Sequence, residues 1–171
     1  MLNMSLHLAE RYFNPNFYSG VSVTDDELTV MLWNLSGQMC GYQIYNPNKP
    51  KKAKEPRDAK YFTHVTKGKD AVWGTETVEW NSPFVFVTEG IFDAARLHYH
   101  GLPAVAVLGN NPKSMSGWFM ELPQDTVAAV QGDTAGLMLA LSTNRAVFLP
   151  EGHDVSSLPE KEFMELFRQF M

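Results

Sequence analysis

Four acidic residues stand shortly after apolar, β-prone runs in the second half of the chain: Glu89, Asp93, Asp133 and Asp154. Glu89 and Asp93 are four residues apart, so a helix beginning there would place both carboxylates on one face of its first turn. Carboxylates that gather at one place repel each other and are costly to bury. Mg²⁺, which is usually held by one or two carboxylates together with substrate phosphates, relieves that cost. The pattern therefore favours a cation site, although each acid taken singly is also typical of a helix N-cap.

The elements that must position these acids alternate between strand and helix. Residues 84–88 form the continuous apolar run that is typical of a strand buried on both faces, and a helical pattern follows over 91–100. Further strands are predicted at 104–108, 126–130 and 146–149, and further helices at 114–120 and 135–142. A capping-box spacing between Ser157 and Glu160 opens a last helix to Phe170. This alternation predicts an α/β fold with a four-stranded, mainly parallel sheet flanked by helices, in which ligands bind at the carboxyl ends of the strands.

The first half of the chain has a different rhythm, without helices that cross between strands. A short helix is expected over 4–13, and the Ser36-Gly37 turn signal predicts a hairpin. Three strands are expected, at 28–33, 40–45 and 61–65. We therefore predict two domains, a small basic α+β subdomain at 1–82 and the α/β domain at 83–171.

The net charge of −5 hides an uneven distribution of charge. Between Lys49 and Lys69 eight basic residues stand against two acidic ones, a local charge of +6, and the rest of the chain carries −11. Such a segment favours a phosphate-binding stripe, with a solvated loop as the alternative. Aromatic residues that flank the segment are candidates for stacking on bases: Tyr42, Tyr45, Tyr61, Phe62 and Trp73.

Around the acidic residues the sequence resembles the TOPRIM domain, the Rossmann-like fold shared by bacterial-type replicative primases, topoisomerases, and certain nucleases and recombination proteins. Thr88–Ala94 (TEGIFDA) is similar to the family's glutamate motif, in the E-G-x-x-D form closest to the primases. Val130–Gly136 (VQGDTAG) is similar to the D-x-D motif, and Leu149–Asp154 (LPEGHD) to the third acidic motif. Upstream segments resemble, more loosely, the basic subdomain that precedes TOPRIM in primases: Gly41–Tyr45, Lys60-Tyr61, Lys67–Lys69 and Trp73-Gly74.

The resemblance implies a role for each acid. Glu89 would act as general acid or base, and Asp133, with Asp93 and Asp154, would hold one Mg²⁺ or Mn²⁺ ion. Basic residues would bind template or nucleotide phosphates: Lys51, Lys52, Lys54, Arg57, Lys60, Lys67, Lys69 and Lys113. Cys40 is the single cysteine, so we expect no zinc site built on two or more cysteines of this sequence.

Two positions depart from the family pattern. Gln131 stands where the first aspartate of the D-x-D motif is expected, and Ser156 where the second acid of the third motif is expected. An amide and a hydroxyl can coordinate Mg²⁺ but contribute no charge, so six expected carboxylates become four. The sequence therefore favours a single ion over a two-metal site.

Three functions are compatible with these features. The first is a DNA primase-like nucleotidyltransferase core that binds single-stranded DNA template and nucleoside triphosphates and synthesises short RNA primers. For this function a replicative helicase or another replication protein is a candidate partner. The second is a TOPRIM protein that has lost catalysis and serves as a nucleic-acid-binding or regulatory protein, and the third is a TOPRIM nuclease.

No apolar run approaches the ~20 residues of a membrane span, and the N-terminus lacks the features of a signal peptide. We therefore expect no membrane association and a cytoplasmic location, in the host cytoplasm if the protein is viral.

Overall fold

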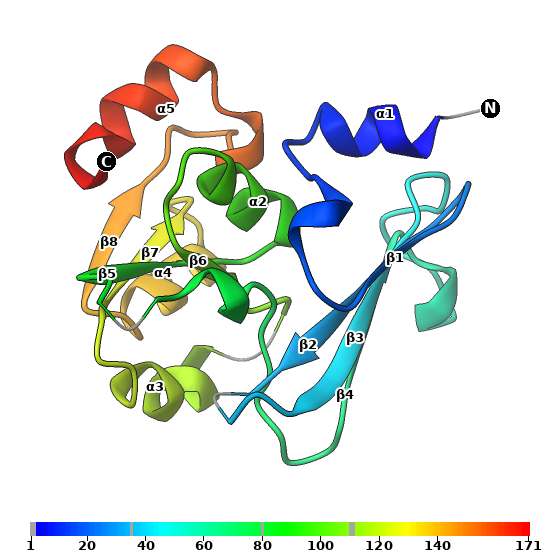
Figure 1. Cartoon of the computed structure of the whole chain (residues 1–171), viewed down its shortest axis with the longest axis horizontal. Helices are drawn as coiled ribbons and strands as arrows, with labels where there is room; N and C mark the ends of the chain where they lie inside the picture. The colour runs from blue at the N-terminus through cyan, green and yellow to red at the C-terminus, as the bar shows by residue number, and fades with distance from the viewer. Residues whose placement is uncertain (1–2, 35, 80, 110–111) are drawn as a thin grey trace.

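The structure is a computed structural model that describes residues 3–34, 36–79, 81–109 and 112–171. Two four-stranded sheets lie side by side, an antiparallel one from the first half of the chain and a parallel one from the second (Figure 1). Within the part of the chain that is described, no helix is long and apolar enough to cross a membrane. The predicted α/β fold with a preceding α+β unit is confirmed.

The antiparallel sheet has the strand order β1-β2-β3-β4. Its strands are β1 (Val21–Val23), β2 (Leu28–Trp33), β3 (Met39–Tyr45) and β4 (Tyr61–Val65). Buried and half-buried residues alternate along β2, so that Leu28, Val30 and Leu32 face the core. The predicted β2–β3 hairpin is confirmed, whereas the three residues of β1 are too few to carry a periodicity and were not predicted.

Helix α1 (Met4–Ala9) is shorter than the predicted helix over 4–13. It ends because Tyr12 adopts a left-handed backbone conformation with φ 60°. This turn brings the backbone N–H of Phe13 to 2.9 Å from the Leu8 carbonyl oxygen and buries the Phe13 ring in the core. A 3-10 helix, η1 (Pro15–Phe17), follows.

The parallel sheet has the strand order β6-β5-β7-β8, with every neighbouring pair parallel. Its strands are β5 (Phe84–Thr88), β6 (Ala104–Ala106), β7 (Asp125–Val130) and β8 (Arg145–Phe148). The helices that follow these strands are α2 (Ile91–Tyr99), α3 (Pro112–Met120), α4 (Thr134–Ala140) and α5 (Glu160–Phe167). Because successive strand residues point to opposite faces, Phe86 packs with α2 and α5, whereas Val85 and Val87 pack with α3 and α4.

A short backbone bridge joins the two sheets. Trp33 of β2 and Val72 exchange hydrogen bonds of 2.9 and 3.0 Å, and Trp73 and Ala106 of β6 exchange hydrogen bonds of 2.9 and 3.1 Å. Trp73 is fully buried, and one hydrophobic core runs from β2 to the α2–α5 face of the parallel sheet. The division into 1–82 and 83–171 stays a prediction, and the two units that it separates share this core.

The chain reaches α5 differently from the prediction. The capping box is formed by Asp154, the N-cap residue, and Ser157, and it begins the 3-10 helix η4 (Val155–Ser157). Pro159 precedes α5 and provides no side-chain cap, so the predicted capping box between Ser157 and Glu160 is wrong. The same spacing occurs twice in this segment, and the Asp154 carboxylate is the stronger hydrogen-bond acceptor. A further 3-10 helix, η5 (Arg168–Phe170), continues the helical region to the predicted end.

Candidate active site at the carboxyl edge of the parallel sheet

The four predicted acids all lie where a strand of the parallel sheet ends. Glu89 follows β5 directly, and its carbonyl oxygen accepts a 3.1 Å hydrogen bond from the Leu108 N–H in the turn after β6. Asp93 lies in the first turn of α2. Asp133 is the N-cap of α4 after β7, and Asp154 is the N-cap of η4 after β8. Because the strands are parallel, these positions share one edge of the sheet.

Glu89 is affected electrostatically by Asp133. Partial burial of its carboxylate, and then the negative charge of Asp133, raise the pKa of Glu89 above its ordinary value. A carboxyl group whose pKa is raised toward neutrality is better suited to act as a general acid or base near pH 7. The electrostatics of Glu89 are therefore compatible with the role implied by the family resemblance.

Asp93 is the most perturbed acid of the group. Burial, and then the charge of Asp154, raise the pKa of Asp93 to about 7, against the lowering effects of a hydrogen bond from Ser156 and of the Arg11 charge. The Asp93 Oδ1 atom accepts that bond from the Ser156 backbone N–H at 2.9 Å. One oxygen of Asp93 is thus already used to hold η4 against α2.

Asp133 and Asp154 each use one oxygen as a helix cap. The Asp133 Oδ1 atom accepts a 2.8 Å hydrogen bond from the Gly136 N–H. The Asp154 Oδ1 atom accepts hydrogen bonds from the Ser157 N–H at 2.8 Å and from the Ser156 hydroxyl at 2.9 Å. The simple N-cap explanation is therefore correct for both residues, but each carboxylate keeps its other oxygen for a ligand.

Among the described residues no group of three or more acidic, histidine or cysteine side chains is arranged to hold a metal ion. The charges of the acids instead act from one residue to the next: beside burial, Asp133 raises the pKa of Glu89, and Asp154 and then Glu89 raise the pKa of Asp93. A protein cage made of three carboxylates does not fit this arrangement. Two carboxylates completed by substrate phosphates do fit it, and this is the usual way in which proteins bind Mg²⁺.

The two departures from the family pattern have structural partners. The Ser156 hydroxyl donates to Asp154 and its N–H donates to Asp93, so this residue links two of the acids. At Gln131 the contact is made by the backbone: its carbonyl packs against Gly136, where an added Cβ atom would lie 2.0 Å from the carbonyl oxygen, and any residue at position 131 would make it. The sequence shows which acids are missing at these positions but not these contacts.

Arg11 lies at this edge of the sheet although it belongs to no motif. Its guanidinium group lies 4.0 Å from the ring centroid of Phe92, the residue before Asp93. Its charge lowers the pKa of Asp93 and, against the larger effect of burial, that of Tyr61. Burial and the charges of Asp93 and Asp154 raise the pKa of Tyr61 to about 12, so the phenol stays protonated and can donate a hydrogen bond. The sequence carried no signal for Arg11, and it indicated Tyr61 only as a candidate for stacking on bases and as part of the Lys60-Tyr61 segment.

Arg96 holds the loop that carries Asp154. This fully buried side chain donates to the carbonyl oxygens of Val155 and Leu158 and forms a 3.1 Å ion pair with Glu160. Its guanidinium also lies 4.6 Å from the ring centroid of Phe163. Because Arg96 and Asp93 lie three residues apart on one face of α2, this helix binds η4 at two points.

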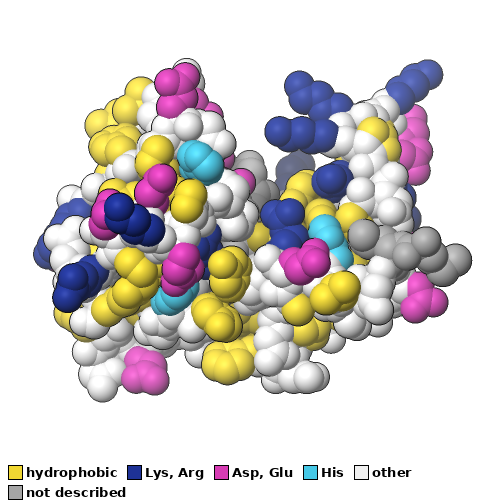
Figure 2. Space-filling model, turned by 90° about the horizontal axis from the view of Figure 1, so that it is seen from above, with side chains coloured by type: hydrophobic (Ala, Val, Ile, Leu, Met, Phe, Trp, Pro, Cys, Tyr) yellow, Lys and Arg dark blue, Asp and Glu magenta, His cyan; other side chains and the backbone are white. Residues whose placement is uncertain are grey.

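The first part of the basic segment, residues 49–60, lies in the loop between β3 and β4. Lys51, Lys52 and Lys54 are exposed, and the Arg57 guanidinium lies 5.4 Å from the ring centroid of Phe62. Lys60 is half-buried. Figure 2 shows a hollow between the two sides of the molecule, with Lys and Arg side chains gathered on the side of the antiparallel sheet.

The remaining predicted basic residues lie elsewhere. Lys67 and Lys69 follow β4, whereas Lys60 precedes it, so that the five residues of the strand separate them. Lys113 is exposed near the start of α3, the helix after β6. The predicted basic residues therefore lie before β4, after β4 and near the start of α3, and their use as one phosphate-binding stripe stays a prediction.

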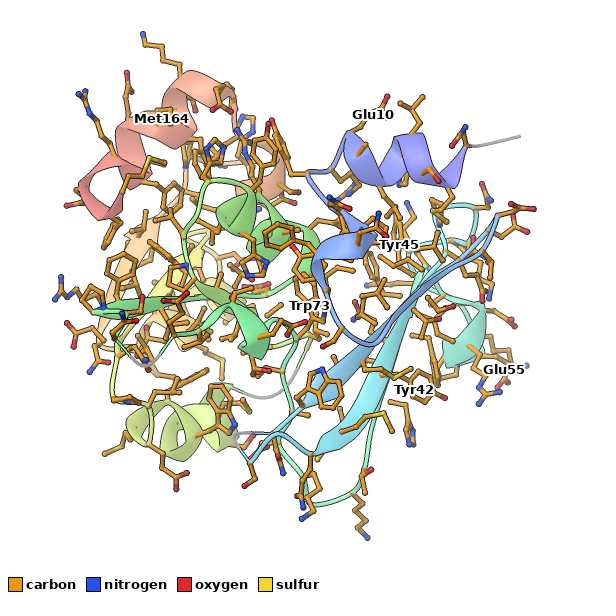
Figure 3. All side chains as sticks on the ribbon, viewed as in Figure 1. Glu10, Tyr42, Tyr45, Glu55, Trp73 and Met164 are labelled. Carbon is orange, nitrogen blue, oxygen red and sulfur yellow. The ribbon has the colours of Figure 1, made fainter. Side chains whose placement is uncertain are left out.

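The predicted stacking residues divide between the two faces of the antiparallel sheet. Tyr45 and Trp73 are buried in the core, so the expectation that they stack on bases is wrong. In Figure 3 they lie on the side of the sheet that faces α2, and Tyr42 lies on the other side. On that outer side Tyr42 and Phe62 are half-buried neighbours, with ring centroids 6.1 Å apart. Tyr61 is 39% exposed and faces the acids.

Comparison with solved structures relates this architecture to known proteins. A DNA primase domain from Pseudomonas aeruginosa matches 99% of this chain with a TM-score of 0.63 at 19% identity. The primase fragment of the bacteriophage T7 primase-helicase protein matches 88% with a TM-score of 0.62 at 14% identity. The DnaG primase catalytic domain bound to single-stranded DNA matches 96% with a TM-score of 0.59 at 19% identity. The sequence matches no family model and no curated protein.

The chain has the fold of a primase catalytic core. This finding confirms the resemblance inferred from the acidic motifs and their order. The primase-like chain spans 59%, 65% and 59% of the length of these three solved chains, so it corresponds to a part of each. At these identities the likeness concerns the fold, and the chemistry has to be argued from the residues at the carboxyl edge.

Proposed function

We propose that this primase-like chain is a nucleotidyltransferase core that binds single-stranded DNA and nucleoside triphosphates and makes short RNA primers. The observation that carries the proposal is the placement of Glu89, Asp93, Asp133 and Asp154 at one sheet edge within a primase-core fold. The basic loop between β3 and β4 supplies the opposite charge that a nucleic acid needs.

The contacts of each acid suggest which of them would bind a metal ion and which would transfer a proton. Asp133 and Asp154, which each have one oxygen not used as a helix cap, would hold one Mg²⁺ ion together with substrate phosphates. Bound there, Mg²⁺ supplies charge neutralisation for the phosphates during transfer. Because its pKa is raised, Glu89 is the carboxylate suited to take or return a proton at the primer 3′ hydroxyl.

A template-dependent primer assay tests the proposal. The wild-type protein should form oligoribonucleotides with Mg²⁺ or Mn²⁺, and Glu89→Gln should lower the rate by about 10²-fold or more. Glu165→Gln, which changes an exposed acid on α5, is the control and should leave the rate unchanged. Absence of primer synthesis by a wild-type protein shown to be folded would contradict the enzymatic proposal.

A second function follows from Gln131 and Ser156. The missing acids and the absence of a three-carboxylate group among the described residues favour a protein that binds nucleic acid without catalysis. In that case template binding persists in Glu89→Gln and no metal-dependent product forms. Cleavage of DNA or RNA with Mg²⁺, in place of synthesis, would indicate the nuclease.

Template binding can be assigned to one part of the basic segment by a pair of matched variants. The first variant is Lys52→Glu/Lys54→Glu, before β4 in the sequence, and the second is Lys67→Glu/Lys69→Glu, after it. Each variant reverses the charge of two exposed lysines that are two residues apart. We expect the first variant to weaken binding of a labelled single-stranded oligonucleotide about tenfold or more and to reduce its salt dependence. The second should have a smaller effect, and equal effects would contradict a template path along the β3–β4 loop.

A further inference from the structure

The turn after α1 fixes the position of Arg11. The Arg11 N–H donates to the Leu8 carbonyl at 3.0 Å, and the left-handed Tyr12 then directs Phe13 back into the core. Leu8 and Phe13 are both fully buried, so the residues on either side of Arg11 are anchored. The position of Arg11 at the carboxyl edge is therefore built into the fold.

The guanidinium of Arg11 has unused hydrogen-bonding capacity. It lies over the Phe92 ring, which supports a flat cation without neutralising it. Its Nε atom is buried without a hydrogen-bond partner, and within the described part of the chain the guanidinium forms no ion pair. Arginine carries five N–H donors in a planar fork, which suits bidentate binding of phosphate.

The surroundings of Arg11 combine acids with a hydrogen-bond donor. Asp93 and Asp154 lie on the side of α2 and η4, and Tyr61 lies on the side of β4. A phosphate brought to carboxylates meets repulsion unless a cation lies beside it. Arg11 is a cation whose charge lowers the pKa of Asp93, whereas Lys51, Lys52 and Lys54 of the β3–β4 loop are exposed.

We propose that Arg11 binds the phosphates of the incoming nucleoside triphosphate at the carboxyl edge. This inference rests on the proposed function and adds a binding residue from outside every recognised motif. Arg11 would hold a phosphate bidentately, with Tyr61 donating a further hydrogen bond. The template would use the β3–β4 loop, so that the two anionic substrates have separate contacts.

Equilibrium binding of inorganic tripolyphosphate in the presence of Mg²⁺ tests the inference without requiring activity. Calorimetry would compare the wild-type protein with Arg11→Met, with Arg11→Lys and with Arg168→Met. Arg168 is exposed in η5, near the C-terminus and distant from α1 in Figure 1, and serves as the matched control. Binding of a labelled single-stranded oligonucleotide and the thermal unfolding midpoint are measured for every variant.

We expect Arg11→Met to weaken tripolyphosphate binding about tenfold or more, because a charge-assisted bidentate contact is lost. Arg11→Lys should lie between Arg11→Met and the wild type, because the charge remains but the planar fork does not. Arg168→Met should bind as the wild type does. Template affinity should be unchanged in all three, and in a primer assay Arg11→Met should raise KM for the nucleotide.

Three results would overturn the inference. They are a wild-type protein that does not bind tripolyphosphate, equal binding by the wild type and both Arg11 variants, and a loss confined to the oligonucleotide. If Arg11→Met fails to fold, the comparison of Arg11→Lys with the wild type decides. Primer synthesis is scored separately. Its absence alongside an intact tripolyphosphate difference would contradict the proposed function and leave the phosphate site standing.

Discussion

The Asp93 carboxylate accepts a hydrogen bond from the Ser156 backbone N–H at 2.9 Å and so joins the first turn of α2 to η4. Asp154 begins η4, and Ser156 donates its hydroxyl hydrogen to this acid. Asp93 therefore has a structural use in addition to the metal role that its motif implies. A substitution at Asp93 can therefore change both the stability of the fold and the binding of a metal ion. The pH dependence of stability, measured without metal, reports on the structural role alone.

Asp93 should make the protein less stable as the pH rises from about 4 toward neutrality. Its folded pKa of about 7 lies above the ordinary value of 3.8, so the folded state holds a proton that the unfolded chain has lost. The stabilisation from this proton is fully present below pH 3.8, is lost progressively as the pH rises from 3.8 to about 7, and does not change further above that. We expect Asp93→Asn to remove this part of the pH dependence in metal-free chemical denaturation. The exposed Asp58→Asn is the control, and an unchanged slope in Asp93→Asn would contradict the assignment.

His98 should act in the opposite direction. This buried ring donates its Nε2–H to the Ala104 carbonyl oxygen at 2.9 Å, and its Nδ1 atom accepts from the Tyr18 hydroxyl at 2.9 Å. Burial lowers the pKa of His98 from 6.5 to about 4. Below pH 6.5 His98 is protonated in the unfolded chain but stays neutral in the folded protein. About 3 kcal/mol of folding stability is therefore lost between pH 6.5 and 4.

The measurement for His98 compares unfolding free energies across that pH range in the wild type and in His98→Gln. The variant should be less stable at pH 7, because the amide fits the two contacts poorly, but its stability should fall less toward acid. His64→Gln changes an exposed histidine of β4 and is the control. Parallel pH curves for the wild type and His98→Gln would show that His98 does not titrate as expected.

Local patterns predicted the fold well because they depend on neighbours in the sequence. The apolar run over 84–88 and the helical pattern after it fix the burial of their own side chains. Whether a strand residue faces the core is harder to predict. Tyr42 and Tyr45 are three residues apart on β3 and so lie on opposite faces, although the sequence alone makes both of them candidates for stacking. Packing against α2 decides which of the two side chains is buried, and α2 lies outside the sequence of the hairpin.

The sequence predicted the acidic residues of the candidate site but not Arg11 or Arg96, and the difference has a physical reason. A carboxylate at a strand end is visible because the strand and the following helix are local. The contacts of Arg96 reach residues 59 to 64 positions away, and Arg11 meets Phe92 across the interface between the two halves of the chain. Such roles depend on the assembled fold and leave no spacing to recognise.

Arg96→Met should destabilise the protein by about 3 kcal/mol, because it leaves the carbonyl oxygens of Val155 and Leu158 without their donor. Glu160→Gln is the matched control, since it weakens the ion pair at its exposed end and should cost less than about 1 kcal/mol. Chemical denaturation measures both. Arg96→Met should also weaken Mn²⁺ binding, because η4 would lose one of its two attachments to α2. Equal stability of the two variants would contradict the positioning role of Arg96.

Gly136→Ala and Gly117→Ala should change stability in opposite directions. In Gly136→Ala the new Cβ atom would lie 2.0 Å from the Gln131 carbonyl oxygen, so the loop that carries Asp133 has to move. We expect a loss of about 1–3 kcal/mol and weaker Mn²⁺ binding. Gly117 lies in α3 with open space around its Cβ position, so alanine there should add about 0.5–1 kcal/mol through helix propensity and leave Mn²⁺ binding unchanged. Chemical denaturation with Mn²⁺ titration measures both effects. Normal Mn²⁺ affinity in a destabilised Gly136→Ala would show that the position of Asp133 does not limit cation binding.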